Sequence, residues 1–233
     1  AFGRLGLLQL CLRGAALLPL EAPLPVLAAL NALFGDELEP PLAIEMHAAR
    51  VGPPERNVLG WGHGLGETEQ VWGHPDLPGW QSVHLRYNTG RAIADNGASL
   101  AALLGELDAD RIALVGHSMG GLVVRAACAV TTDAEERWTD LVTNVVTLGS
   151  PHLGAPLERG VALGARALGL LPESAPFGRI LEYRSVGILD LRHGLARDVQ
   201  NLPRARYRLV AATLSRSSGS VSAGSLGDMP VPY

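Results

Sequence analysis

The chain has 233 residues, 47% of them hydrophobic, and its formal net charge is -4 at pH 7. This length and composition can bury a full core, which predicts one folded domain, or one domain with a small appendage, and argues against a disordered protein. The acidic balance and the scattered arginines offer no basic surface, so we expect no nucleic-acid partner. Cys11 and Cys128 lie far apart in the sequence, which gives no support for a disulfide framework or a cysteine-based metal site.

Residues 1–50 are predicted to form an N-terminal helical extension. The first 35 residues are apolar with helical spacing and are interrupted by prolines, a pattern typical of two or three short helices. Such helices could cover a face of a sheet or lie on a membrane surface. The scarcity of basic residues favours the sheet and leaves peripheral membrane contact as the alternative. The run at residues 5–20 is a poor membrane span because Arg13 and Pro19 break it, and it lacks the cleavage pattern of a signal peptide. We therefore expect a location in the cytoplasm or at a membrane surface rather than secretion.

Residues 51–233 alternate between β-like and helix-like runs, which predicts an α/β domain. Strands are predicted at residues 57–61, 82–87, 111–115, 143–148 and 207–213. Helices are predicted at residues 67–72, 92–107, 120–130 and 157–170. This alternation implies βαβ units and therefore a mostly parallel sheet with helices on both faces.

The strongest functional signal is the sequence GHSMGG at residues 116–121, which contains G-x-S-x-G between a predicted strand and a predicted helix. The pattern alone is weak in a chain with 28 glycines, and the strand-to-helix context is what makes it informative. So sharp a turn strains the backbone of its central residue, and side chains at the flanking glycines would clash with the strand or the helix. Ser118 is therefore predicted to be a nucleophile at the carboxyl edge of the sheet, where open α/β sheets bind ligands.

A serine nucleophile of this kind works with an oxyanion hole made of two backbone N–H groups. The residue after the nucleophile supplies one of them. Here that residue is Met119, at the start of a helix whose dipole favours an anion. The sequence HGLG at residues 63–66 follows the first predicted strand, and we predict that the amide of Leu65 supplies the second N–H group. A simple glycine-rich turn is the alternative.

Three segments together resemble the lipase and esterase branch of the α/β-hydrolase superfamily. They read HGLG at residues 63–66, GHSMGG at residues 116–121 and LGSPHLGAP at residues 148–156. Over roughly residues 57–233, the chain is similar to small bacterial triacylglycerol lipases and to hydrolases that resemble GPI inositol-deacylases. The resemblance implies the α/β-hydrolase fold and an ester hydrolase that needs no cofactor.

The resemblance also implies a chain order of nucleophile, acid and histidine, with the acid in a loop after the strand at residues 207–213. Asp228 is the candidate acid. A solvated turn residue is the alternative, and Asp190 and Asp198 are weaker candidates because they precede that strand. No histidine follows Asp228. Either the sequence stops before its last strand and the histidine loop, which we favour, or the base comes from an unusual position.

Three internal histidines lie close to these motifs. His193 is the best internal substitute for the base, although a surface or capping role fits it better. His152 follows a strand end and is expected to support the site without taking part in it. His117 belongs to the strand-to-helix turn, and its side chain should point away from Ser118.

These features predict a serine hydrolase that cleaves small-molecule or lipid esters through an acyl-enzyme on Ser118. Amide or thioester hydrolysis by the same residues, and a non-catalytic binding module with this fold, are the alternatives. Trp61, Trp72 and Trp80 are expected around the oxyanion loop, either as a wall for an acyl chain or as core residues. The N-terminal helices and residues 157–180 could form a lid.

Overall fold

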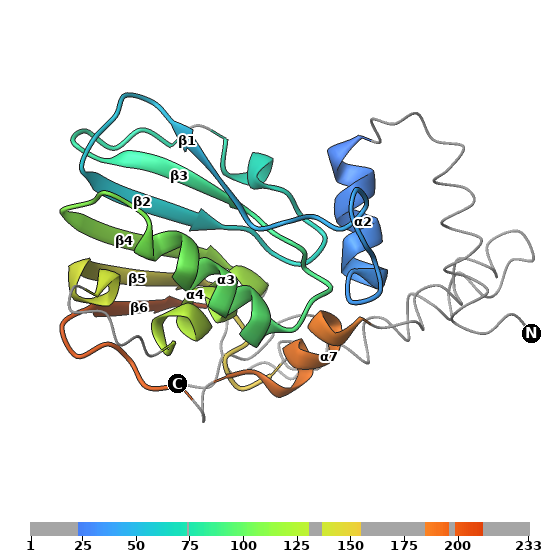
Figure 1. Cartoon of the computed structure of the whole chain (residues 1–233). Helices are drawn as coiled ribbons and strands as arrows, with labels where there is room; N and C mark the ends of the chain where they lie inside the picture. The colour runs from blue at the N-terminus through green and yellow to red at the C-terminus, as the bar shows by residue number, and fades with distance from the viewer. Residues whose placement is uncertain (1–22, 74, 131–136, 155–184, 196–198, 212–233) are drawn as a thin grey trace, which may run out of the picture.

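A six-stranded sheet lies at the centre of the computed structural model, which describes residues 23–73, 75–130, 137–154, 185–195 and 199–211 (Figure 1). The strands are β1 (His47–Val51), β2 (Asn57–Gly62), β3 (Gln81–Arg86), β4 (Arg111–His117), β5 (Val142–Leu148) and β6 (Arg206–Val210). Their order across the sheet is β1-β3-β2-β4-β5-β6. Every neighbouring pair is parallel except β1 with β3, so the predicted mostly parallel sheet is confirmed.

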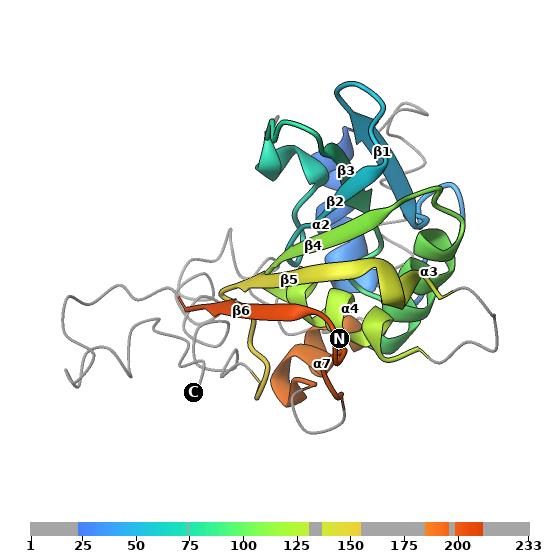
Figure 2. The same ribbon diagram turned by 90° about the vertical axis from the view of Figure 1, so that its left-hand side faces the viewer.

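Helical segments flank this sheet. Within the described residues they are α2 (Leu24–Phe34), α3 (Ile93–Gly105), α4 (Met119–Cys128) and α7 (Val186–His193), with the short 3-10 helices η1 (Glu69–Trp72) and η2 (Trp138–Leu141). Helices α3 and α4 lie side by side on one face of the sheet (Figures 1 and 2). On the other face, Trp72 of η1 contacts Trp61 of β2, with ring centroids 4.9 Å apart. Trp61 points to that face because side chains alternate along a strand, and its neighbours Gly60 and Gly62 face the α4 side.

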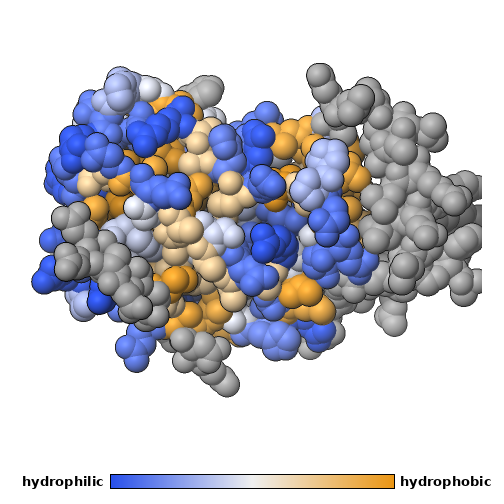
Figure 3. Space-filling model, in the orientation of Figure 1, coloured by the Kyte–Doolittle hydropathy of each residue, from blue (hydrophilic) through white to orange (hydrophobic). Residues whose placement is uncertain are grey.

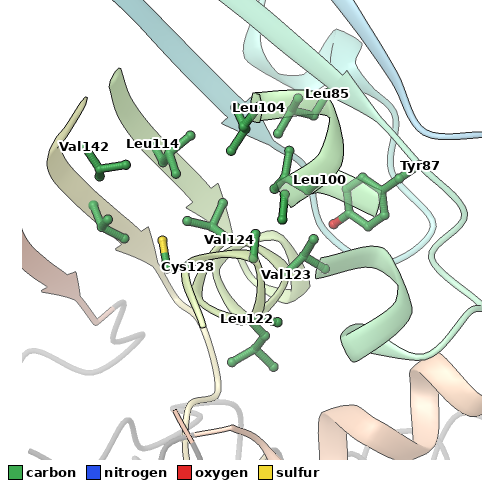
Figure 4. Close-up of a cluster of buried hydrophobic side chains, with 14 of the residues drawn as sticks. Leu85, Tyr87, Leu100, Leu104, Leu114, Leu122, Val123, Val124, Cys128 and Val142 are labelled. Atoms are coloured by element: carbon green, nitrogen blue, oxygen red, sulfur yellow. The ribbon is translucent and has the colours of Figure 1, made fainter. Parts of the chain in front are cut away.

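The hydrophobic core lies between the sheet and the helices α3 and α4 (Figure 4). Ile112 and Leu114 of β4 are fully buried, and so are Leu122 and Val124 of α4. On the face toward these helices β4 is buried, and on its other face Ala113 is buried and Val115 half-buried, which explains why β4 reads as a nearly continuous apolar run in the sequence. This core fixes the end of β4, and the start of α4, against the rest of the sheet.

The strand β1 was not predicted from the sequence. It is the antiparallel edge of the sheet, with His47 opposite Arg86 and Val51 opposite Ser82. Its sequence HAARV is only partly buried and shows no apolar alternation, so pairing with β3, not local propensity, forms this strand. The sheet therefore begins before the boundary that we predicted between residues 50 and 51.

The helix α2 lies beyond the carboxyl ends of the parallel strands (Figure 1). The expectation that it covers a sheet face is therefore wrong. Asn31, which is fully buried, fixes the helix in place. Its side-chain amide donates to the Leu42 carbonyl over 2.8 Å, and its side-chain oxygen accepts from the Ile44 N–H over 2.9 Å. The helix α7 packs beside α2, and the Ser185 hydroxyl donates to the Ala32 carbonyl over 2.6 Å.

Residues 186–193 form α7, which carries Asp190 and His193 and was not predicted from the sequence. The predicted helix at residues 157–170, the possible lid at residues 157–180 and Asp228 lie outside the described residues. None of the helices among the described residues is long and apolar enough to cross a membrane. On the face that Figure 3 shows, polar residues are interspersed with separate groups of apolar residues, which lie over the sheet side as well as over the regions of α2 and α7.

Candidate functional site

Ser118 lies between the end of β4 and the first residue of α4, with φ of 50° and ψ of -118°. It is the one non-glycine residue with positive φ in the described parts of the chain. Its N–H donates to the Leu148 carbonyl at the end of β5 over 2.8 Å, which ties the turn to the neighbouring strand. Ser118 is half-buried, and no described residue forms a hydrogen bond with its Oγ. The structure thus places this hydroxyl in the strained turn that the sequence predicted.

The glycines around Ser118 are needed because backbone segments meet there. A methyl group on Gly116 would lie 2.4 Å from the Gly121 nitrogen, and one on Gly120 would lie 2.4 Å from the Gly62 oxygen. A methyl group on Gly121 would lie 2.0 Å from the Ser150 Oγ. Carbon atoms do not approach other atoms so closely, so each of these positions excludes a side chain. The contact between Gly120 and Gly62 also brings the start of α4 against the end of β2.

The two predicted oxyanion donors lie on these adjoining segments. Met119 is the first residue of α4, where an N–H group has no acceptor within the helix. Leu65 lies in the loop of residues 63–67 after β2. In this loop the Gly64 N–H donates to the Glu67 Oε2 over 2.6 Å. The Gly66 N–H donates to the Thr89 Oγ1 over 3.2 Å, and the Glu67 N–H donates to the Gly64 carbonyl over 3.3 Å. The described contacts leave the N–H of Leu65 without an acceptor, as an oxyanion donor requires.

Glu67 joins this loop to the turn that holds Ser118. Its Oε2 accepts the Gly64 N–H and lies 3.0 Å from the Nδ1 of His117, the residue before Ser118. From the sequence, Glu67 was predicted only as the first residue of a helix, and these contacts were not predicted. The available signal was a carboxylate three residues after Gly64, close enough for a local loop contact. His117 points toward Glu67, and no described hydrogen bond joins it to Ser118, as the sequence led us to expect.

His63 forms the buried base of the same loop. Its ring stacks on Tyr87 with centroids 4.4 Å apart, and its Nδ1 donates to the Gly64 carbonyl over 2.9 Å. The Tyr87 hydroxyl donates to the His63 carbonyl. Burial lowers the pKa of His63, which keeps the ring uncharged, and it raises the pKa of Tyr87. These two rings support the backbone that carries Leu65.

The acid and the base of a triad are not brought to Ser118 by the described residues. Asp228 lies outside them, and so does Asp198. Asp190 is already engaged, because its Oδ2 accepts the N–H of Ile93 at the start of α3 over 2.9 Å. This helix-capping contact explains why an acid occurs in α7 without a role beside Ser118.

His152 and His193 both have partners away from Ser118. His193 is exposed, and its Nδ1 donates to the Leu189 carbonyl of its own helix over 3.1 Å. His152 is buried, with Nδ1 3.0 Å from Arg125 Nη1 and Nε2 2.9 Å from Thr147 Oγ1. Arginine can only donate, so Nδ1 accepts and Nε2 carries the proton that it donates to Thr147. Burial, followed by the charge of Arg125, lowers the pKa of His152 to about 4, so this histidine is neutral and structural.

The three tryptophans do not form one wall. Trp61 and Trp72 contact each other, and the Trp61 indole N–H donates to the Ser82 Oγ over 3.2 Å. Trp80 immediately precedes β3. The guanidinium of Arg111, the first residue of β4, lies 5.7 Å from the centroid of the Trp80 ring. The amino ends of parallel strands lie at the edge opposite Ser118. The expectation that Trp80 borders the oxyanion loop is therefore wrong.

A cavity of about 560 Å³ lies between the segment after α2 and the start of α3, with Asp36, Ile44, Met46 and Arg91 among its lining residues. Ser118, Met119 and Leu65 are not part of its lining. The described residues contain no cluster of three or more His, Cys, Asp or Glu side chains that could hold a metal ion.

Comparison with known proteins agrees with this geometry. Residues 103–164 match the model of a family described as the PGAP1-like alpha/beta domain. The mature form of BlEst2, a lipase of Bacillus licheniformis, is similar with a TM-score of 0.52 and 21% identity, over 75% of this chain and 75% of the lipase. The propeptide form gives a TM-score of 0.53 and 22% identity over 72% of this chain, which spans 39% of that longer protein. No curated protein matches the chain in sequence. The strand order, the turn at Ser118 and these likenesses together establish that the chain has the α/β-hydrolase fold.

Proposed function

We propose that the protein is a serine hydrolase that cleaves carboxylic esters. The observation that carries this proposal is the backbone of Ser118, which is held at positive φ between a buried strand and a helix N-terminus. Such strain persists only where the surrounding structure imposes it, and it is typical of functional sites. The likeness to a bacterial lipase at 21% identity supports the fold that holds this serine at the end of a strand.

The proposed reaction is acyl transfer to water through two similar steps. The Oγ of Ser118 attacks the ester carbonyl carbon while a histidine base takes the hydroxyl proton, and the carbonyl oxygen becomes an oxyanion. The N–H groups of Leu65 and Met119 hold that oxyanion, and Asp228 orients the histidine. Collapse of the intermediate breaks the carbon–oxygen bond and releases the alcohol, which takes the proton from the histidine. Water then attacks the acyl-enzyme in the same way and releases the acid.

The proposal is tested by labelling the full-length protein with a fluorophosphonate, which reacts with activated serines. We expect one label per molecule in the unmodified protein and none in Ser118→Ala. Ser99→Ala is the matched control, because Ser99 is half-buried on α3 and its hydroxyl donates only to the Asp95 carbonyl of its own helix, so labelling should be unchanged. Hydrolysis of a p-nitrophenyl ester, but not of the matching anilide, would identify the substrate bond. Labelling that persists in Ser118→Ala would overturn the proposal.

A further inference from the structure

We propose that Glu67 is a positioning residue that preforms the oxyanion hole by fastening the loop of residues 63–67 to the turn at Ser118. The inference rests on the proposed function, because it assigns the Leu65 amide the role of oxyanion donor. Glu67 itself does not touch the substrate. Its carboxylate acts through the two protein groups that it contacts.

The first contact selects which amide of the loop is free. Because the Glu67 Oε2 accepts the Gly64 N–H over 2.6 Å, that N–H group is turned toward Glu67 and away from other acceptors. Two residues further along, the N–H group of Gly66 donates to the Thr89 Oγ1. Leu65 lies between these two anchored amides, so its peptide plane is restrained from both sides. Its N–H is the one left available in this part of the loop.

The second contact sets the distance between the two halves of the oxyanion hole. The same Oε2 lies 3.0 Å from the Nδ1 of His117, and the exposed fractions of the two side chains are 43% for His117 and 32% for Glu67. The loop and the turn also approach each other directly, since a methyl group on Gly64 would lie 3.2 Å from the His117 Nδ1. One carboxylate oxygen thus connects the segment of Leu65 to the segment of Met119. Loss of this oxygen would leave the Gly64 N–H without its acceptor and free the loop to move against α4.

The experiment compares Glu67→Ala, Glu67→Gln and Glu69→Gln in the full-length protein, using fluorophosphonate labelling and p-nitrophenyl ester hydrolysis. Loss of one oxyanion donor lowers kcat by about 100-fold or more, so a misplaced donor should lower kcat and the labelling rate about 10- to 100-fold in Glu67→Ala, with KM changed less than about threefold. In Glu67→Gln the amide oxygen can still accept the Gly64 N–H, so kcat should stay within about threefold of the unmodified protein. Glu69→Gln is the matched control, because Glu69 pairs with Arg86 and not with the loop amides, so kcat should not change.

The outcomes separate this inference from the proposed function. If the unmodified protein shows no Ser118-dependent labelling, the proposed function fails. If labelling depends on Ser118 but Glu67→Ala reacts as fast as the unmodified protein, the inference about Glu67 is overturned. If Glu67→Ala does not fold, Glu67→Asp is used in its place. Aspartate keeps the negative charge, but its side chain is one carbon shorter, so its oxygen lies further from the Gly64 N–H and from His117. A Glu67→Gln variant faster than Glu67→Asp supports the inference, and equal or reversed rates contradict it.

Discussion

Ser118 adopts a conformation that costs a residue with a Cβ atom on the order of 1–3 kcal/mol. The contacts around it must offset that cost, and the hydrogen bond from its N–H to Leu148 and the buried first turn of α4 are the ones that hold it. Only glycine would adopt this backbone without strain. A side chain at this position is thus retained against the local preference of the chain, which is expected where the side chain has a chemical task.

This strain can be measured by comparing Ser118→Gly with Ser118→Ala. Both variants lack the Oγ, so the hydroxyl does not contribute to the difference between them. Glycine relieves the strain, but its greater freedom in the unfolded chain removes part of the gain. We expect Ser118→Gly to exceed Ser118→Ala by about 1 kcal/mol in free energy of unfolding, measured with urea. Equal stability of the two variants would mean that the turn is not strained.

The lowered pKa of His152 should make the stability of the protein depend on pH. Its pKa is about 4 in the folded protein, against 6.5 for an ordinary histidine, so the unfolded chain binds this proton more readily. The contribution of this residue to the free energy of unfolding is fully present above pH 6.5 and falls as the pH drops from 6.5 toward 4. Below pH 4 the free energy of unfolding is lower by about 3 kcal/mol. Urea unfolding between pH 7 and 4 measures the slope. His152→Gln, whose amide can accept from Arg125 and donate to Thr147, should lack this contribution, and an unchanged slope would contradict the assignment.

At the scale of elements, the helices α3 and α4 approach closely because α3 carries a glycine where they meet. A methyl group on Gly97 would lie 2.6 Å from the Cβ of Ala126 and 3.0 Å from its backbone carbon. Gly105, at the end of the same helix, is exposed, and a methyl group there would meet only Trp138, at 3.8 Å. The close contact holds α4, and hence its N-terminus beside Ser118, against its neighbour.

The two glycines give a matched pair of substitutions within one helix. Alanine improves helix propensity at either site, by up to about 1 kcal/mol. At Gly97 the added methyl must separate α3 from α4, so we expect Gly97→Ala to lower the free energy of unfolding by about 1–3 kcal/mol. Gly105→Ala should leave it unchanged or raise it slightly. Thermal and urea unfolding provide the measurement, and a Gly97→Ala protein as stable as Gly105→Ala would show that the helices can move apart without cost.

At the scale of the whole molecule, the sequence predicts best what local patterns determine. The strands β2 and β4 are buried on the face toward α4 and read directly as apolar runs, and the strained turn at Ser118 follows from its glycines. The strand β1 depends on pairing with β3, and α2 was misplaced because an apolar helix does not reveal which surface it covers. These features are set by contacts between segments distant in the sequence.

In the candidate site, too, residues within one continuous segment were predicted, whereas contacts between distant segments were not. The motifs predict Ser118 and Met119 directly because both lie in one continuous turn, whereas the role of Glu67 depends on the approach of His117, fifty residues later in the chain. Trp80 was misplaced because closeness in sequence to the loop does not reveal the edge of the sheet on which a residue lies. Spatial contacts of this kind arise only once the sheet has formed.

The strand order has a consequence for how such a protein can vary. The strands β2 and β4, which lead into the loop of Leu65 and the turn of Ser118, are direct neighbours inside the sheet, while β1 and β6 are the outermost of the described strands. Insertions at the borders would add surface without changing the register between the two inner strands. A lineage can therefore remodel what surrounds Ser118, and with it the proposed substrate site, while inheriting unchanged the spacing between Ser118 and the amides of Leu65 and Met119.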